Sequence, residues 1–188
     1  ADFITYNLDI QSNITYAAIK YNVKKLIFFG SSCIYPSTFN KPLKEEFIFS
    51  GNLEQSSVSY AIAKLAGIQM CLSYNKQLKN KVFMPLIPAS VYGPGDNFDQ
   101  NSSHVLSGLI SKIDRAKRCG IPSLELWGSG NPLREFIFVD DIADVCFFLL
   151  NNQSKFDYEM PINIGSGFEL SINDLAKLIS KIIGYKGE

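Results

Sequence analysis

The stretch Lys25-Leu26-Ile27-Phe28-Phe29-Gly30 decides the fold class. Four consecutive apolar residues closed by a glycine are typical of a strand that is buried on both faces. A helical spacing of apolar residues precedes this stretch at 2–21, and a run of helix formers follows it at 58–78. A second apolar run, at 82–87, is ended by Pro88. Buried strands that alternate with helices predict an α/β fold with a doubly wound, Rossmann-type parallel sheet.

The second half of the chain predicts shorter elements. We expect helices at 103–118, at 141–150 behind an Asp140 cap, and from a Ser171 capping box to about 183, with strands at 124–127, 135–139 and 162–164. We therefore divide the chain into two parts. Residues 1–119 are expected to form the C-terminal part of a dinucleotide-binding domain with the catalytic residues. Residues 120–188 are expected to form part of a smaller α/β substrate-binding lobe, some of whose strands can return to the main sheet.

Composition excludes several classes of protein. Of the 188 residues, 46% are hydrophobic and 19% are charged, which indicates a sizeable core rather than a disordered tail. Eighteen Lys and Arg residues balance eighteen Asp and Glu residues without a long basic tract, which argues against a nucleic-acid partner. No apolar run reaches the ~18–20 residues of a membrane span, and no signal peptide is visible. The four cysteines lie far apart, which argues against a disulfide framework and a metal site, so we expect a reducing, cytoplasmic setting.

Glycine pairs of the form G-x-G occur at 93–95, 128–130 and 165–167. None continues into the G-x-G-x-x-G pattern that opens a helix in dinucleotide-binding folds, so we interpret all of them as turns. A glycine-rich loop for the pyrophosphate of a dinucleotide is therefore expected upstream of this sequence. Because the chain also does not begin with Met, we expect it to be a piece of a longer protein that lacks the first strands of the sheet.

The pattern Tyr-x-x-x-Lys places a phenol and an ammonium on one face of a helix. It occurs at 16–20, at 21–25 and at Tyr60 with Lys64, so the pattern alone is weak. Only Tyr60 begins a helix on the side where the strands end, which is the ligand side of such a sheet. The alternative for Tyr60 and Lys64 is an ordinary solvated pair on a helix surface.

Ser31, directly after the first strand, gives the pair chemical meaning. A cation near a phenol lowers the pKa of that phenol from about 10 toward neutrality, so Tyr60 would give or take a proton. Ser31 would hold the reacting oxygen, and Lys64 would also be placed to hold the ribose of a cofactor.

At these residues the sequence resembles a known family, the extended short-chain dehydrogenases/reductases that act on nucleotide sugars, among the NAD-dependent epimerases/dehydratases. Within that family it is most similar to the epimerase-reductases that convert GDP-4-keto-6-deoxy-mannose to GDP-L-fucose with NADPH. The resemblance extends over nearly all of the chain and rests on GSSCIYP (30–36), YAIAKLAG (60–67), YGPGDNF (92–98), SSHV (102–105), WGSGNPLREFIFVDD (127–141) and INIGSG (162–167).

The resemblance implies a role for each matched residue. It makes Ser31, Tyr60 and Lys64 the reducing set, and Cys33 and His104 the acid and base that invert C3 and C5 beside the C4 ketone. Without the resemblance, a lone histidine is more often structural and a buried cysteine is more often inert. Thiol and imidazole groups both titrate close enough to neutrality to move a carbon-bound proton.

The resemblance also implies binding residues and an assembly. The substrate side would carry Ser32, Lys112, Trp127 and Arg134, and the nicotinamide side of NADPH would carry Tyr60, Lys64, Pro88, Ala89, Ser90 and Val91. For Trp127 the alternative is an aromatic residue in the core of the smaller lobe. The implied partner is a GDP-sugar, and the implied assembly is a homodimer through the helices around 2–21 and 60–78.

Alternatives stay open for the substrate and for activity. Where the family commonly has Thr-Asn-Leu, this chain has Ala89-Ser90-Val91, so a GDP-colitose-type substrate or another nucleotide-sugar epimerase/dehydratase reaction is possible. Cys33 together with His104 argues against a simple 4-epimerase. A rival from another class is a catalytically silent piece that only binds a partner or a nucleotide sugar, because function belongs to complete sites.

Overall fold

The computed structural model describes residues 2–36, 42–152, 156 and 158–188. The helices are α1 (Asp2–Lys20), α2 (Val58–Leu78), α3 (Val105–Arg118), α4 (Val139–Asn151) and α5 (Ile172–Ile183). The strands are β1 (Leu26–Phe29), β2 (Phe83–Pro88), β3 (Ser90–Tyr92), β4 (Leu133–Phe138), β5 (Ile162–Ile164) and β6 (Glu169–Ser171), with 3-10 turns η1 (Ser32–Ile34), η2 (Glu45–Phe47) and η3 (Gln55–Ser57). The chain forms two compact units, Ala1–Ala89 with Asp141–Ile164, and Ser90–Asp140 with Gly165–Glu188.

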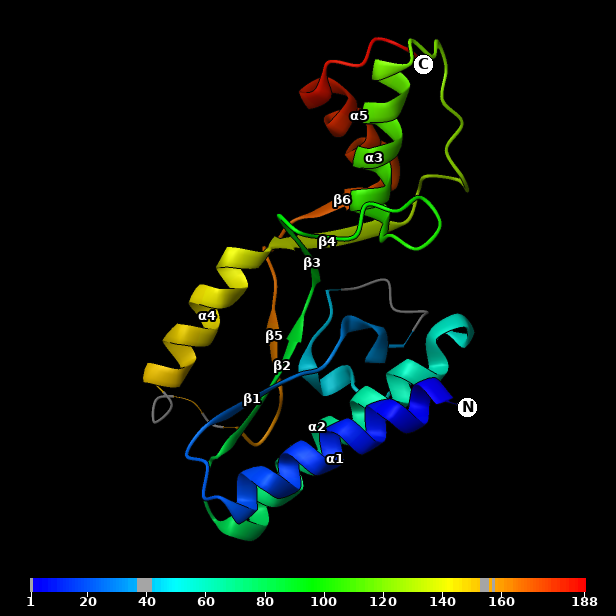
Figure 1. The fold of residues 1–188 in the computed structure, drawn as a ribbon. Helices are drawn as coiled ribbons and strands as arrows, with labels where there is room; N and C mark the ends of the chain where they lie inside the picture. The colour runs from blue at the N-terminus through cyan, green and yellow to red at the C-terminus, as the bar shows by residue number, and fades with distance from the viewer. Residues whose placement is uncertain (1, 37–41, 153–155, 157) are drawn as a thin grey trace. The chain divides into compact units, whose positions relative to one another are not determined.

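The first unit is built on a parallel sheet with the strand order β1-β2-β5. Side chains of β2 alternate between two helical layers, as expected for a strand covered on both faces. Phe83 packs with Ala18 of α1 and Cys71 of α2, whereas Met84 packs with Leu149 of α4. Figure 1 shows α1 and α2 side by side, with the strands between this pair and α4. The predicted doubly wound α/β architecture is confirmed.

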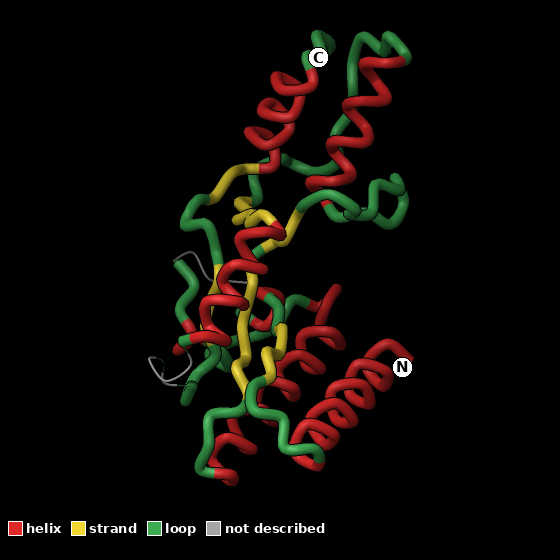
Figure 2. Tube along the Cα trace, turned by 60° about the vertical axis from the view of Figure 1, so that its left-hand side comes forward, coloured by secondary structure: helices red, strands yellow, loops and turns green. Residues whose placement is uncertain are grey.

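The second unit joins a small sheet to two helices. β4 pairs in parallel with β3 and antiparallel with β6. Figure 2 shows α3 and α5 side by side, and a core cluster that includes Leu109, Ile113 and Ile179 lies between them. The predicted capping box is confirmed, because the hydroxyl of Ser171 accepts the N–H of Asp174 at 3.0 Å at the start of α5.

Several expected boundaries were wrong. The chain at 124–127 forms no strand. Its apolar positions, Leu124 and Leu126, pack against the core cluster between α3 and α5, which explains the apolar pattern without a strand. α4 begins at Val139, so Asp140 lies inside the helix and does not cap it. The chain passes from one compact unit to the other after residues 89, 140 and 164. The expected division after 119, with its assignment of the two parts to cofactor and substrate, stays a prediction.

A search of the described helices finds none that is both long and apolar enough to cross a membrane. The expected cytoplasmic location stays a prediction. All four cysteines are free thiols. Among the described residues, no group of three or more His, Cys, Asp or Glu side chains is arranged to hold a metal ion.

Candidate active site

Gly30 directly follows β1, and its backbone passes close to α2 and β2. Its N–H donates to the carbonyl of Leu86 at 2.7 Å, which continues the pairing of β1 with β2 beyond the strand. A Cβ at this position would lie 2.9 Å from the Cδ1 of Ile68 and 3.2 Å from the Leu86 carbonyl oxygen. The glycine is therefore required by the close approach of backbone to a helix and a strand.

Ser31 then opens the short turn η1. Ser31 has extended backbone angles, and its hydroxyl accepts the N–H of Cys33 at 3.4 Å. Ser32 is exposed, Cys33 is half-buried, and Ile34 is buried. The turn thus presents a hydroxyl and a thiol at the carboxyl end of β1 while Ile34 anchors it in the core.

Tyr60 and Lys64 lie one turn apart near the start of α2. The ammonium of Lys64 donates to the carbonyl of Phe29 at 2.9 Å. It also lies 5.3 Å from the ring centroid of Phe28 and 5.5 Å from that of Tyr60. These contacts fix the lysine against the end of β1 and over the face of the phenol ring.

The pKa of Tyr60 is raised, whereas the sequence analysis expected it to be lowered. Burial raises the pKa of the phenol, the nearby Cys33 thiol raises it further, and a hydrogen bond with Ser31 opposes both. The expected net lowering by Lys64 is not found, because burial dominates the shift. Tyr60 therefore holds its proton at neutral pH.

The electrostatic influence of Lys64 falls on Cys33. Burial raises the pKa of the thiol, while the Ser31 hydrogen bond and the Lys64 charge lower it and the carboxylate of Glu54 raises it. Burial in turn lowers the pKa of Lys64, and the thiolate of Cys33 opposes that shift. The first unit thus brings Ser31, Cys33, Tyr60 and Lys64 into one interacting group.

Glu54 was missed by the sequence analysis. It is exposed, it immediately precedes η3, and its carboxylate accepts the hydroxyl of Ser56 at 2.9 Å. No motif contains it, and only folding places its charge near Cys33.

The expected cofactor stretch at 88–91 crosses from one unit to the other. Pro88 ends β2, and the N–H of Ala89 donates to the carbonyl of Ile164 at 2.8 Å. Ser90 and Val91 belong to β3, where they pair with β4. Their role stays a prediction.

His104 is the N-cap residue of α3 in the second unit. Its carbonyl accepts the N–H of Gly108 at 2.8 Å and the hydroxyl of Ser107 at 3.2 Å. The imidazole makes no capping hydrogen bond, and the residue is exposed. The imidazole of His104 therefore does not cap the start of α3.

Trp127 and Lys112 lie together in the second unit. Trp127 is 89% exposed, so the alternative of a lobe-core aromatic is wrong. The Lys112 ammonium lies 5.7 Å from its ring centroid and donates to the carbonyl of Glu125. Arg134, exposed on β4, donates to the carbonyl of Leu133 at 2.8 Å.

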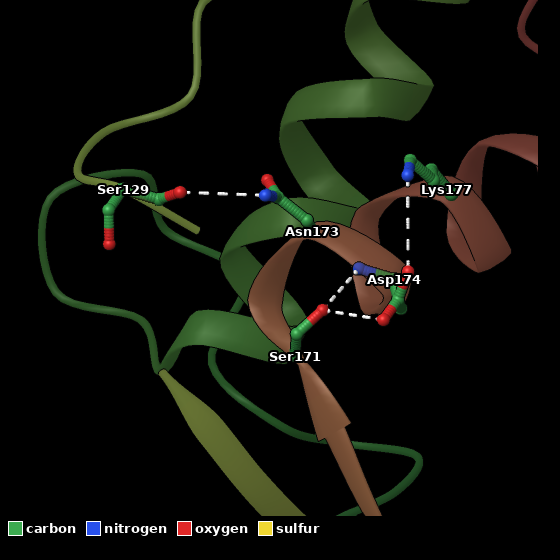
Figure 3. A network of polar contacts seen from close by, with 5 residues as sticks. All are labelled: Ser129, Ser171, Asn173, Asp174 and Lys177. Atoms are coloured by element: carbon green, nitrogen blue, oxygen red, sulfur yellow. Dashed lines mark hydrogen bonds and ion pairs between the residues drawn. The ribbon is translucent and has the colours of Figure 1, made fainter. Parts of the chain in front are cut away.

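The loop between Trp127 and β4 is held by the first residues of α5 (Figure 3). The side chain of Asn173 donates to the carbonyl of Ser129 at 3.5 Å, and its backbone N–H donates to that of Gly130 at 3.0 Å. Gly130 has a φ of +71°, and a Cβ there would overlap the Asn173 side chain. The sequence showed only the capping box at this place and not the contact with the loop.

Comparisons with known proteins agree with this geometry. GDP-L-fucose synthase 1 of Arabidopsis thaliana is 44% identical over 188 residues, which are 100% of this chain and 57% of that protein. GDP-L-colitose synthase of Yersinia pseudotuberculosis is 37% identical over 98% of this chain and 59% of its own length. The solved structure of a GDP-mannoheptose C4 reductase from Campylobacter jejuni with NADP bound has a TM-score of 0.90 and 37% identity, covering 100% of this chain and 65% of that one.

The chain thus spans somewhat more than half the length of the curated relatives that it matches. The model of the NAD dependent epimerase/dehydratase family matches residues 1–165. With the motifs, the parallel sheet and this match in agreement, the chain belongs to the NAD-dependent epimerase/dehydratase family.

Proposed function

We propose that this chain carries the catalytic residues of a nucleotide-sugar epimerase-reductase that converts GDP-4-keto-6-deoxy-mannose to GDP-L-fucose with NADPH. The observation that carries the proposal is the group Ser31, Cys33, Tyr60 and Lys64 at the carboxyl end of β1. A simple ketone reduction uses a serine, a tyrosine and a lysine. A thiol within the same group adds a means of moving a carbon-bound proton.

For the reduction, Tyr60 is the proton donor. Its raised pKa keeps the phenol protonated at neutral pH, so it can protonate the C4 oxygen as the carbonyl becomes an alcohol. The Ser31 hydroxyl, which already bonds with Tyr60, donates to the same oxygen and orients it. NADPH, when bound, supplies the hydride that adds to C4.

For the epimerisation, Cys33 and His104 share the proton transfers. The raised pKa of Cys33 keeps it a thiol at neutral pH, which suits the group that returns a proton to carbon. The imidazole of His104 has a ring nitrogen that can accept a proton, which suits the base that removes one. Each inversion takes one proton from carbon and gives one back on the opposite face, so no net oxidation occurs.

The residues present fit the ribose of a nicotinamide cofactor. The Lys64 ammonium has three N–H donors, and the described structure assigns one of them to Phe29. The remaining donors and the nearby phenol suit ribose hydroxyls at the carboxyl end of a parallel sheet. The preference for NADPH rests on relatives such as the reductase with NADP bound.

The second unit supplies groups suited to the GDP-sugar. The forked guanidinium of Arg134 matches a diphosphate, and the exposed ring of Trp127 offers a flat face to a sugar or a base. Lys112 adds a charge beside that ring. The colitose-type sugar is the second candidate, favoured by the Ala89-Ser90-Val91 sequence and by the Yersinia relative.

A homodimer through α1 and α2 is also part of the proposal. Phe3, Tyr6, Ile10 and Ile14 of α1 are each more than half exposed and recur at helical spacing on this helix. A second copy of the chain would cover this row. Changing both Ile10 and Ile14 to Lys should give a monomer in analytical ultracentrifugation, whereas Ile182→Lys on α5 should not. A wild-type monomer would contradict the dimer.

The experiment that tests the activity follows NADPH absorbance with GDP-4-keto-6-deoxy-mannose, using this chain and a form extended at its N-terminus. Product analysis by NMR reads inversion at C3 and C5 separately from reduction at C4. The 3-deoxy analogue of the substrate tests the colitose-type alternative in the same assay. Turnover with inversion is the expected result for the extended form, and no turnover by either form would overturn the proposal.

A further inference from the structure

A buried polar network lies behind the Ser31–Cys33 turn in the first unit. Tyr35 is only 5% exposed, and its hydroxyl donates to the side-chain carbonyl of Asn163 at 2.6 Å. Tyr35 directly follows the η1 turn and Asn163 lies on β5, so the bond joins segments that are far apart in the sequence. The mechanism above uses neither residue.

Asn163 connects the turn to a third segment. Its backbone N–H donates to the carboxylate of Glu45 at 2.8 Å, and its side-chain amide donates to the carbonyl of Leu43 at 3.1 Å. On the other side β5 is paired with β2, where Asn163 lies opposite Ile87. One residue of the sheet therefore ties the catalytic turn and the 43–45 segment to the same strand.

Tyr35 lies two residues beyond Cys33 and ends η1. Its N–H donates to the carbonyl of Ser32 at 3.2 Å. The other bonds within this turn are as long or longer, with Ile34 N–H to Ser31 carbonyl at 3.2 Å and Cys33 N–H to Ser31 hydroxyl at 3.4 Å. The contact of 2.6 Å that Tyr35 makes to β5 is shorter than each of these three bonds.

A plainer explanation is that Asn163 only satisfies a buried hydroxyl, since buried phenols usually find a partner. Tyr158 of the same unit is 2% exposed, and its hydroxyl has no hydrogen-bond partner among the described residues, so it serves as a comparison. The bond of Tyr35 differs in its place, because it lies next to the proton-transfer group and ends on Asn163, which also holds Leu43 and Glu45.

We propose that Tyr35 and Asn163 are positioning residues that fix the turn carrying Ser31 and Cys33. Their catalytic consequence rests on the proposed function, whereas their effect on the Cys33 thiol does not. The ring of Tyr35 packs with Ile34, Leu65 and Ile68. Tyr35→Phe keeps this ring and removes only the hydroxyl, so it tests the hydrogen bond separately from the packing.

The test is the alkylation rate of Cys33 by iodoacetamide in Tyr35→Phe, measured by peptide mass mapping across a pH range. Loss of one net hydrogen bond shifts an opening equilibrium by about three- to tenfold, so the half-buried thiol should react faster by about that factor. The midpoint of its pH profile should also move down as burial is relieved. Tyr158→Phe is the matched control and should leave both readouts unchanged. Buried Cys71 reports global opening in the same samples.

An unchanged Cys33 rate in Tyr35→Phe would overturn the proposal, as would a parallel rise at Cys71, which indicates general unfolding. Asn163→Leu should reproduce the effect of Tyr35→Phe, and the double variant should add little. In the active form, Tyr35→Phe should lower kcat about three- to tenfold with KM for the sugar nearly unchanged. If the thiol responds but the wild-type protein shows no turnover, the proposed function fails and the positioning role stands.

Discussion

The turn that carries Ser31 and Cys33 and the loop that follows Trp127 are held in opposite ways. The turn is anchored from behind by buried residues, Ile34 and Tyr35. The loop is held by the exposed first residues of α5, through Asn173 and the backbone of Gly130.

This difference matches what each region is proposed to do. Proton transfer requires atoms held in a fixed geometry, and a close-packed core provides it. Binding of a sugar nucleotide allows small movements of the residues that contact it. Polar contacts exposed to water break and re-form at little cost in free energy. Substitutions in the turn should therefore act on kcat and stability, and substitutions in the loop on KM.

The largest expected effect is that of Tyr60→Phe. Loss of the proton donor should lower reduction by about 10²–10⁴-fold, while the ring contact with Phe3 is kept. The rate of NADPH oxidation measures the loss. Tyr16→Phe, an exposed tyrosine of the same Tyr-x-x-x-Lys pattern, should leave the rate unchanged. A Tyr60→Phe rate within tenfold of wild type would contradict the role of the phenol.

Next come Cys33→Ser and His104→Gln. Each should slow inversion at C3 or C5 by about 10²-fold or more and leave the reduction of an already inverted ketone intact. Exchange of carbon-bound hydrogen in deuterated water, followed by NMR, measures the inversion step alone. Joint loss of inversion and reduction would count against a separate acid/base pair.

Ile34→Ala tests whether the turn depends on its buried anchor. Ile34 is 0% exposed, so its truncation should cost about 2–5 kcal/mol of unfolding free energy. Urea unfolding measures the cost. Ile182→Ala, on an exposed position of α5, should change it by no more than about 0.5 kcal/mol. Equal losses at the two positions would remove the contrast between buried and exposed anchoring.

Alkaline pH tests the buried phenol of the same turn. Burial raises the pKa of Tyr35 from 10.0 to about 12, and the carboxylate of Glu45 adds to the rise. The unfolded chain then loses this proton at lower pH than the folded one, so the stabilisation is complete below pH 10 and is lost toward pH 12. At about pH 11 the loss should be about 1 kcal/mol.

Urea unfolding at about pH 9 and about pH 11 measures this fall, which Tyr35→Phe should reduce. The buried thiol of Cys71, whose pKa is also raised to about 12, should leave a residual fall in both proteins. An equally steep fall without the Tyr35 hydroxyl would show that other groups dominate.

The smallest effect is expected for Asn173→Ala in the exposed loop contact. It should cost no more than about 1 kcal/mol of unfolding free energy and raise KM for the sugar nucleotide about threefold at unchanged kcat. Steady-state kinetics separates the two constants. A fall in kcat without a change in KM would erase the proposed difference between the loop and the turn.

Much of the fold follows from local sequence patterns. β1 and β2 were predicted because each is an apolar run closed by a glycine or a proline, and the short β5 was predicted as well. β3 was missed because only Ala89 separates it from β2, and β6 because it continues directly into the capping box at Ser171. The run at 124–127 was misread because apolar residues that pack on two helices look like a short strand.

The candidate site residues that lie on a single helix or at the end of a single strand could be proposed from the sequence. The spacing of Tyr60 and Lys64 follows from the helix alone, and Ser31 follows from the end of a strand. The direction of the Tyr60 pKa shift was not predictable, because it depends on burial and on the nearby Cys33, which only the folded structure shows. Asn163 was missed because its partners lie more than a hundred residues away in the sequence.

The bond between Glu45 and the amide of Asn163 also bears on how the protein behaves at high concentration. A strand at the rim of a sheet offers its unpaired amides as a template on which another chain can add and start aggregation. In β5 the Ile164 carbonyl faces the β2 side, so the neighbouring Asn163 amide faces outward, where the Glu45 carboxylate occupies it. An added strand would have to displace that side chain and set its own carbonyls against a negative charge. Among the described strands β5 is the last of this sheet, and the Glu45 carboxylate therefore disfavours the addition of another strand beside it.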